Sequence, residues 1–165
     1  MNRIACGLAV LALVGCRLDG PTKPKDEPKA KGADELKLSE DEQAVLDATN
    51  TERKAANLPP LTADKKLMEA ASGHAANMAR QDKLDHTLDG QGADERAKAA
   101  GYAYSRLGEN IAWNQPTPKA AVAGWMQSQG HKENLLNDQY TQIGVAVAKN
   151  AKGERYWVQV FGTPR

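Results

Sequence analysis

The chain has 165 residues, a length typical of one domain, and its 22 basic and 21 acidic residues give a formal net charge of +1. This balance, together with the lack of any basic block, argues against nucleic-acid binding. Both cysteines, Cys6 and Cys16, lie near the start of the chain. The remainder therefore offers neither a disulfide framework nor a thiolate metal site.

The first fifteen residues have the pattern of a processing signal. A basic start with Arg3 precedes an apolar run from Ile4 to Val14 that is too short to span a bilayer as a stable helix. The run ends in Leu13-Val14-Gly15-Cys16, which resembles the lipobox of bacterial lipoproteins and implies cleavage before Cys16 and lipidation of its thiol. Several acyl chains on one residue would anchor the chain stably to a membrane. The alternative is an ordinary secretory signal with an incidental cysteine.

A hydrophilic segment follows the signal, and we predict a lipidated tether over residues 16–38. Pro21, Pro24 and Pro28 interrupt a stretch that has almost nothing apolar to bury. Arg17 stands after the cysteine, where an aspartate is associated with inner-membrane retention. This favours the outer membrane in a cell that has two. The folded domain is predicted over residues 39–165.

Several helices are predicted in the first two thirds of the domain from capping residues and apolar spacing. Ser39 and Glu42 fit a capping box, and a second helix after Asp64 carries an apolar stripe. The predicted helices run from Ser39 to about Ala56, from Asp64 to near Lys83, from Ala93 to Ala100, from Thr117 to Gly130, and from His131 to near Leu136.

The end of the chain has the alternation of a β-hairpin. Ile143, Val145 and Val147 alternate with small residues, and a turn at 150–153 leads back through Tyr156 to Phe161. Helices first and strands last predict an α+β domain, in which helices pack on an antiparallel sheet.

Two histidines and one glutamate are the candidate functional side chains. His86 lies in a loop at the end of a predicted helix, and Glu109 lies in the stretch Gly108-Glu109-Asn110-Ile111. His131 begins a short helix, and Asn134 shares its face. His74 lies on the inward stripe of its helix, so we interpret it as a core histidine rather than a ligand.

Taken together, these segments resemble the CAP superfamily in its bacterial SCP-domain branch. The resemblance runs from about Val45 to Phe161 and implies the family's three-layer α-β-α sandwich. The segments that match are Asn50 and Arg53 with Leu58-Pro59-Pro60-Leu61, Ala71 to Met78, His86, Gly108 to Ile111, Trp125 to Asn134, Tyr140 to Gly144, and Trp157 to Phe161.

The resemblance implies a central cleft with two histidines and two acidic residues, and in some members a divalent cation. His86 matches the first histidine and Glu109 the first acid, whereas Gln139 stands at the second histidine and Ser128 near the second acid. We expect His131, in the pattern Ser128-Gln129-Gly130-His131, to supply a replacement imidazole. His86, Glu109 and His131 would suit zinc with an open position, or the missing ligand leaves only a polar pocket.

Three functions follow as hypotheses, and no catalytic residue is assigned. The preferred one is a lipid-anchored, extracytoplasmic envelope protein whose cleft binds a lipid, cell-wall or protein ligand. The second is a metal-dependent hydrolase with Glu109 as general base. The third is a purely structural interaction protein. No His-Glu-x-x-His or Gly-x-Ser-x-Gly motif supports the hydrolase.

Overall fold

A computed structural model describes residues 36–165, and the predicted signal peptide and most of the predicted tether, residues 1–35, lie outside the described residues. No helix in the described part is long and apolar enough to span a membrane. The elements in chain order are α1 (Glu40–Ala55), β1 (Thr62–Ala63), α2 (Lys65–Gln81), α3 (Ala93–Ala99), β2 (Tyr104–Trp113), α4 (Pro118–Gln127), α5 (Gln129–Leu135), β3 (Gln142–Lys149) and β4 (Arg155–Pro164).

The helices begin at the capping residues that the sequence indicates. Ser39 and Glu42 form a reciprocal capping box at α1, and Asp64 accepts hydrogen bonds from two backbone amides of α2. Thr117 caps α4, with Pro118 in its first turn. The predicted break at Gly130 is wrong: the chain leaves helical geometry at Ser128, and Gly130 lies inside α5.

The sheet has four strands in the order β1-β3-β4-β2. The predicted hairpin is confirmed as β3 and β4, which pair antiparallel from Gln142↔Gly162 to Lys149↔Arg155. The sequence did not predict two further strands. The ten-residue β2 pairs antiparallel with β4, and the two-residue β1 pairs parallel with β3, so the sheet is mixed.

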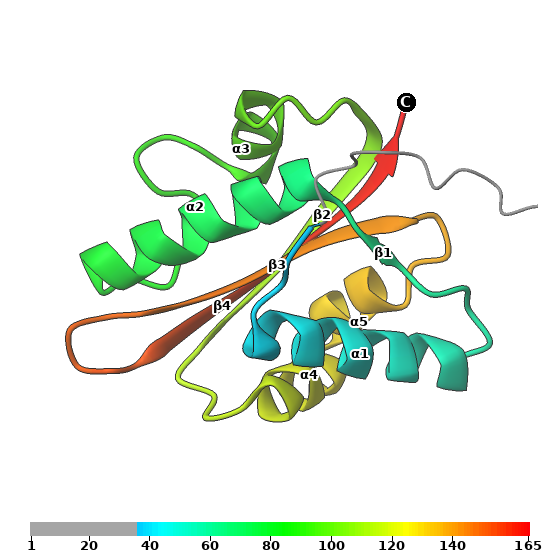
Figure 1. Ribbon diagram of the computed structural model, residues 1–165, viewed down its shortest axis with the longest axis horizontal. Helices are drawn as coiled ribbons and strands as arrows, with labels where there is room; N and C mark the ends of the chain where they lie inside the picture. Colours follow the sequence, from blue (N-terminus) through cyan, green and yellow to red (C-terminus); the bar gives the residue numbers. More distant parts are fainter. Residues whose placement is uncertain (1–35) are drawn as a thin grey trace, which may run out of the picture. The chain divides into compact units, whose positions relative to one another are not determined.

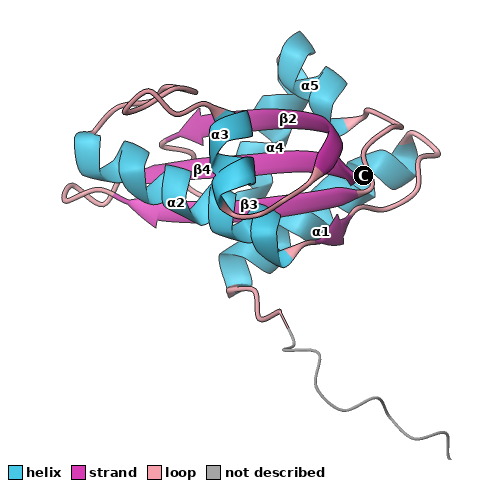
Figure 2. Cartoon of the chain, turned by 90° about the horizontal axis from the view of Figure 1, so that it is seen from above, coloured by secondary structure: helices cyan, strands magenta, loops and turns pink. Residues whose placement is uncertain are grey.

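Helices cover both faces of this sheet. Figure 1 shows α2 and α3 on one side and α1, α4 and α5 on the other, and Figure 2 shows α2 and α3 in front of the strands. The alternation in β4 separates two cores: Trp157 and Phe161 belong to one cluster, and Val158 and Val160 to the other. The predicted α+β sandwich is confirmed.

A close contact fixes the height of α2 above the sheet. A Cβ atom at Gly144 of β3 would lie 2.1 Å from the backbone carbonyl of Leu67, so only glycine permits this approach. Because α2 lies so close to the strands, a side chain on its inward face reaches the neighbouring side chains of the sheet. His74 is such a side chain, and it is fully buried.

Candidate functional site

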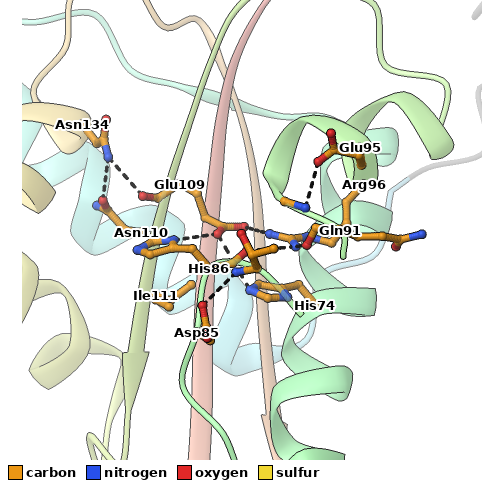
Figure 3. A network of polar contacts seen from close by, with 12 residues as sticks. His74, Asp85, His86, Gln91, Glu95, Arg96, Glu109, Asn110, Ile111 and Asn134 are labelled. Atoms are coloured by element: carbon orange, nitrogen blue, oxygen red, sulfur yellow. Dashed lines mark hydrogen bonds and ion pairs between the residues drawn. The ribbon is translucent and has the colours of Figure 1, made fainter. Parts of the chain in front are cut away.

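The candidate site is built around the carboxylate of Glu109 in β2. The Glu109 side chain is only 4% exposed, and it projects towards the face of the sheet that α2 and α3 cover. Figure 3 shows its oxygens between His86, His74 and Arg96. These three side chains come from a loop and two helices, so the fold brings them together from separate parts of the chain.

Arg96 of α3 holds one oxygen of this carboxylate. Its Nη2 lies 2.6 Å from Glu109 Oε2, and its side chain is 8% exposed. Its Nη1 donates to the backbone carbonyls of His86 at 3.1 Å and Gln91 at 2.6 Å. The guanidinium therefore neutralises a buried carboxylate and also fixes the loop that carries His86.

His86 contacts the other oxygen. Its Nδ1 lies 2.8 Å from Glu109 Oε1, and its side chain is 55% exposed. The hydrogen bond to Glu109 is the main reason why the pKa of His86 is raised above its ordinary value, with burial acting against it. Since Nδ1 faces Glu109, Nε2 is the ring nitrogen left to meet a ligand.

His74 lies on the buried side of the same carboxylate. Its Nε2 is 3.8 Å from Glu109 Oε1, and its side chain is fully buried. Burial is the main cause that lowers the pKa of His74, and the nearby Glu109 carboxylate acts in the opposite direction. The predicted core location is confirmed, but this core histidine also borders the candidate site.

The short helix α5 is held against β2 by side-chain amides. Asn134 Nδ2 donates to the backbone carbonyl of Glu109 at 3.1 Å and to Asn110 Oδ1 at 3.0 Å. Asn110 Nδ2 in turn donates to the carbonyl of His131 at 3.0 Å. Gly108 is needed here, because a Cβ atom would lie 2.4 Å from the Tyr140 hydroxyl oxygen. These contacts hold Asn134 against the backbone of Glu109 and the backbone of His131 against Asn110.

The other predicted residues, His131, Ser128 and Gln139, differ in their burial and their contacts. His131 is half-buried, and burial followed by the charge of His86 lowers its pKa. Ser128 is half-buried at the N-cap of α5, where its side chain makes no capping hydrogen bond. Gln139 is exposed, and its side-chain amide donates to Asp138 at 3.0 Å rather than to the cluster.

The predicted zinc ligands do not form a three-ligand set. Among residues 36–165, no group of three or more histidine, cysteine, aspartate or glutamate side chains is arranged to hold a metal ion. Glu109 already contacts His86 Nδ1 and Arg96, so it is placed to orient the imidazole rather than to bind a cation directly. Of the three predicted ligands, only His86 and His131 are then left as candidates.

Comparison with known proteins identifies the family. The profile of the CAP family, described as the cysteine-rich secretory protein family, matches residues 46–161. The chain belongs to the CAP family. The match begins within α1 and ends within β4, so the CAP domain includes every element that contributes to the Glu109 cluster.

The proteins similar to this chain include bacterial ones. The uncharacterized protein YkwD of Bacillus subtilis is 36% identical over 121 residues, or 73% of this chain and 46% of the relative. An extracellular SCP-domain protein from Bacillus anthracis has 32% identity and a TM-score of 0.69, over 74% of this chain and 40% of that chain. An outer surface protein from Borrelia burgdorferi has 25% identity and a TM-score of 0.73, over 79% and 97%. This chain thus spans less than half of the first two, and the second and third are described as an extracellular protein and an outer surface protein.

Two side chains near Glu109 in the CAP domain, Arg96 and His74, were not predicted to lie there. Arg96 lies among charged residues in Asp94-Glu95-Arg96, a pattern typical of a solvated helix, yet it is buried. Its position next to Ala97 could have indicated burial, because these two residues are the ones that α3 buries. His74 was recognised as buried, but its proximity to Glu109 depends on the tertiary fold.

The raised pKa of His86 gives a direct prediction. We expect His86 to titrate above about 6.5, and His74 and His131 below it, in an NMR titration of the imidazole Cε1–H signals. The stabilisation from protonated His86 and Glu109 is fully present below the unfolded pKa and is lost as pH rises through the raised folded pKa. Glu109→Gln should lower the His86 midpoint and leave that of His131 almost unchanged. A His86 midpoint unaffected by Glu109→Gln would contradict the assignment.

Proposed function

We propose that this chain is an extracytoplasmic protein of the bacterial cell envelope, anchored by lipid on Cys16, whose CAP domain binds a ligand in a polar cleft. The cleft is formed by His86 and Glu109 together with His131, Ser128 and Asn134 on or beside α5. The ligand classes that suit a lipid-anchored surface protein are a lipid, a cell-wall component or a protein.

The binding function is supported chiefly by the contacts and the burial of the Glu109 carboxylate. Both of its oxygens have close partners, Arg96 at 2.6 Å and His86 at 2.8 Å, and its side chain is only 4% exposed. A general base needs a free lone pair within reach of a water molecule or substrate. Glu109 lacks that access, whereas His86 is 55% exposed and has its Nε2 free of Glu109. The geometry therefore supports recognition by His86 rather than hydrolysis by Glu109.

The cleft can be tested without knowing the ligand, by photocrosslinking in intact cells. A benzoylphenylalanine in place of the exposed Gln129 on α5 should give a specific adduct, and one in place of the exposed Lys119 on α4 should not. The adduct should disappear in His86→Ala, a substitution of an exposed side chain that leaves the buried Arg96–Glu109 pair intact. Equal labelling at both positions, or labelling that survives His86→Ala, would argue against the cleft.

The anchor has a separate test. Cys16→Ser should prevent lipidation and move the protein from the membrane fraction to the soluble extracytoplasmic fraction. The extracellular and surface locations of two relatives support this placement outside the cytoplasm. A Cys16→Ser variant that stays with the membrane would refute the lipid anchor, and it would leave the cleft proposal unaffected.

A further inference from the structure

A cavity lies between α2 and α3, and Arg96 is the residue of the Glu109 cluster that lines it. Its volume is about 520 Å³, within the roughly 300–1,000 Å³ usual for small-molecule sites. Its apolar lining consists of small side chains and one leucine: Ala70, Gly73, Ala76, Leu88, Ala99 and Ala100. Neither His86 nor Glu109 lines it, so it is a separate place on the CAP domain.

Gly73 gives this groove its depth. A Cβ atom at Gly73 would meet nothing within 4 Å, and the residue lies in the middle of α2. Neither a positive φ angle nor a close neighbour requires glycine at this position. Because glycine is unfavourable in a helix interior, the position weakens the helix and adds open space to the groove.

Arg96 lines the groove from the α3 side, and one of its three guanidinium nitrogens is unused. Its two terminal nitrogens bind Glu109, His86 and Gln91, but its buried Nε–H has no hydrogen-bond partner among residues 36–165. A buried donor without an acceptor is costly, and an acceptor that reached it would remove that cost. The nitrogen is covered in the free protein, so binding has to displace part of the wall that covers it.

The charged side chains of the groove argue against an anionic ligand. Besides two arginines they include Glu69, whose exposed carboxylate would repel an anion. The two arginines in its lining are both paired with carboxylates, Arg80 with Asp89 at 3.4 Å and Arg96 with Glu109 at 2.6 Å. An anionic ligand would have to compete with these carboxylates. A neutral carbonyl oxygen can accept from the remaining Nε–H without disturbing either pair.

We propose that the groove between α2 and α3 is a binding site for a small uncharged amide. Its carbonyl oxygen accepts a hydrogen bond from Arg96 Nε–H, and its apolar part lies on the alanines beside Gly73. This site is independent of the proposed function of the His86 cleft. Through Arg96, its occupant contacts the side chain that holds Glu109.

The test uses three probes with the same ring and different polar groups. N-cyclohexylacetamide, cyclohexylammonium and cyclohexanecarboxylate are titrated separately into the ¹⁵N-labelled chain. The amide should cause saturable shifts of the Gly73 amide and Arg96 Nε–H signals, and the two ions should not. Equal shifts with all three probes, or no saturable shift with the amide, would overturn the proposal.

Variants at Gly73 supply the matched control. Gly73→Leu fills the groove with a side chain that the helix accommodates, so it should weaken amide binding by about tenfold or more. Gly73→Ala removes the glycine but leaves most of the space and should keep the affinity within about threefold. An unchanged His86 titration in Gly73→Leu shows that the fold and the Glu109 cluster are intact. Undiminished amide binding by this folded variant would also refute the site.

Discussion

Replacing Arg96 with alanine should lower the free energy of unfolding by about 3–5 kcal/mol, because it leaves a buried carboxylate without its cation. The Glu109 side chain is 4% exposed and the Arg96 Nη2 lies 2.6 Å from its Oε2. The same substitution frees the backbone carbonyls of His86 and Gln91 from their donor. Urea unfolding followed by tryptophan fluorescence measures the change as a shift of the midpoint at constant slope.

Arg80→Ala is the matched control for this result. Arg80 also pairs with a carboxylate, that of Asp89 at 3.4 Å, but both side chains are more than half exposed. We expect a loss of roughly 0–1 kcal/mol there. Adding Glu109→Gln to Arg96→Ala should recover part of the stability, since the buried charge is removed. Similar losses of stability for Arg96→Ala and Arg80→Ala would show that burial does not strengthen the Arg96–Glu109 ion pair.

Replacing Arg53 with methionine should cost about 3 kcal/mol, since it deprives several backbone carbonyls of a donor while keeping much of the side-chain volume. Arg53 is fully buried, and burial lowers its pKa. Its Nη1 donates to the carbonyls of Leu135 at 2.9 Å and Asn137 at 2.8 Å, and its Nε donates to that of Pro59 at 3.0 Å. Arg53 thus fixes the end of α5, and hydrogen exchange of the α5 amides should become faster in this variant.

Lys54→Met tests whether the effect is specific to the buried arginine. Lys54 is the next residue along α1 and is exposed, so its replacement should change stability by no more than about 0.5 kcal/mol. Hydrogen exchange in α5 should stay at the wild-type rate in Lys54→Met. Protection of α5 that is the same in both variants would contradict the role of Arg53 in holding the helix that carries His131.

The helices and the last hairpin could be predicted because their determinants are local. Ser39, Asp64 and Thr117 cap helices within a few residues of themselves, and the turn at 150–153 joins two strands of clear alternation. Strand β2 has no such local pattern. Its sequence from Tyr104 to Glu109 mixes polar, apolar and glycine residues, and its strand geometry comes from pairing with β4.

The site could be predicted only in part for the same reason. Glu109 and His86 were found from their motif and loop position, and the structure places them 2.8 Å apart. Arg96 contacts Glu109 from α3, and His74 approaches it from α2. A local sequence pattern cannot predict contacts between residues that lie so far apart in the chain. A charged residue in a polar helix looks solvated until its partner across the fold is known.

Calorimetric titration of zinc into the chain with Cys6→Ser and Cys16→Ser tests whether the His86–Glu109 cluster binds this metal, or whether Glu109 only orients His86. The substitutions remove thiolates that would bind zinc themselves. Because Arg96 and His86 already hold the carboxylate, we expect no saturable binding at micromolar zinc. Saturable micromolar binding that is lost in His86→Ala and His131→Ala would show instead that the two imidazoles hold zinc.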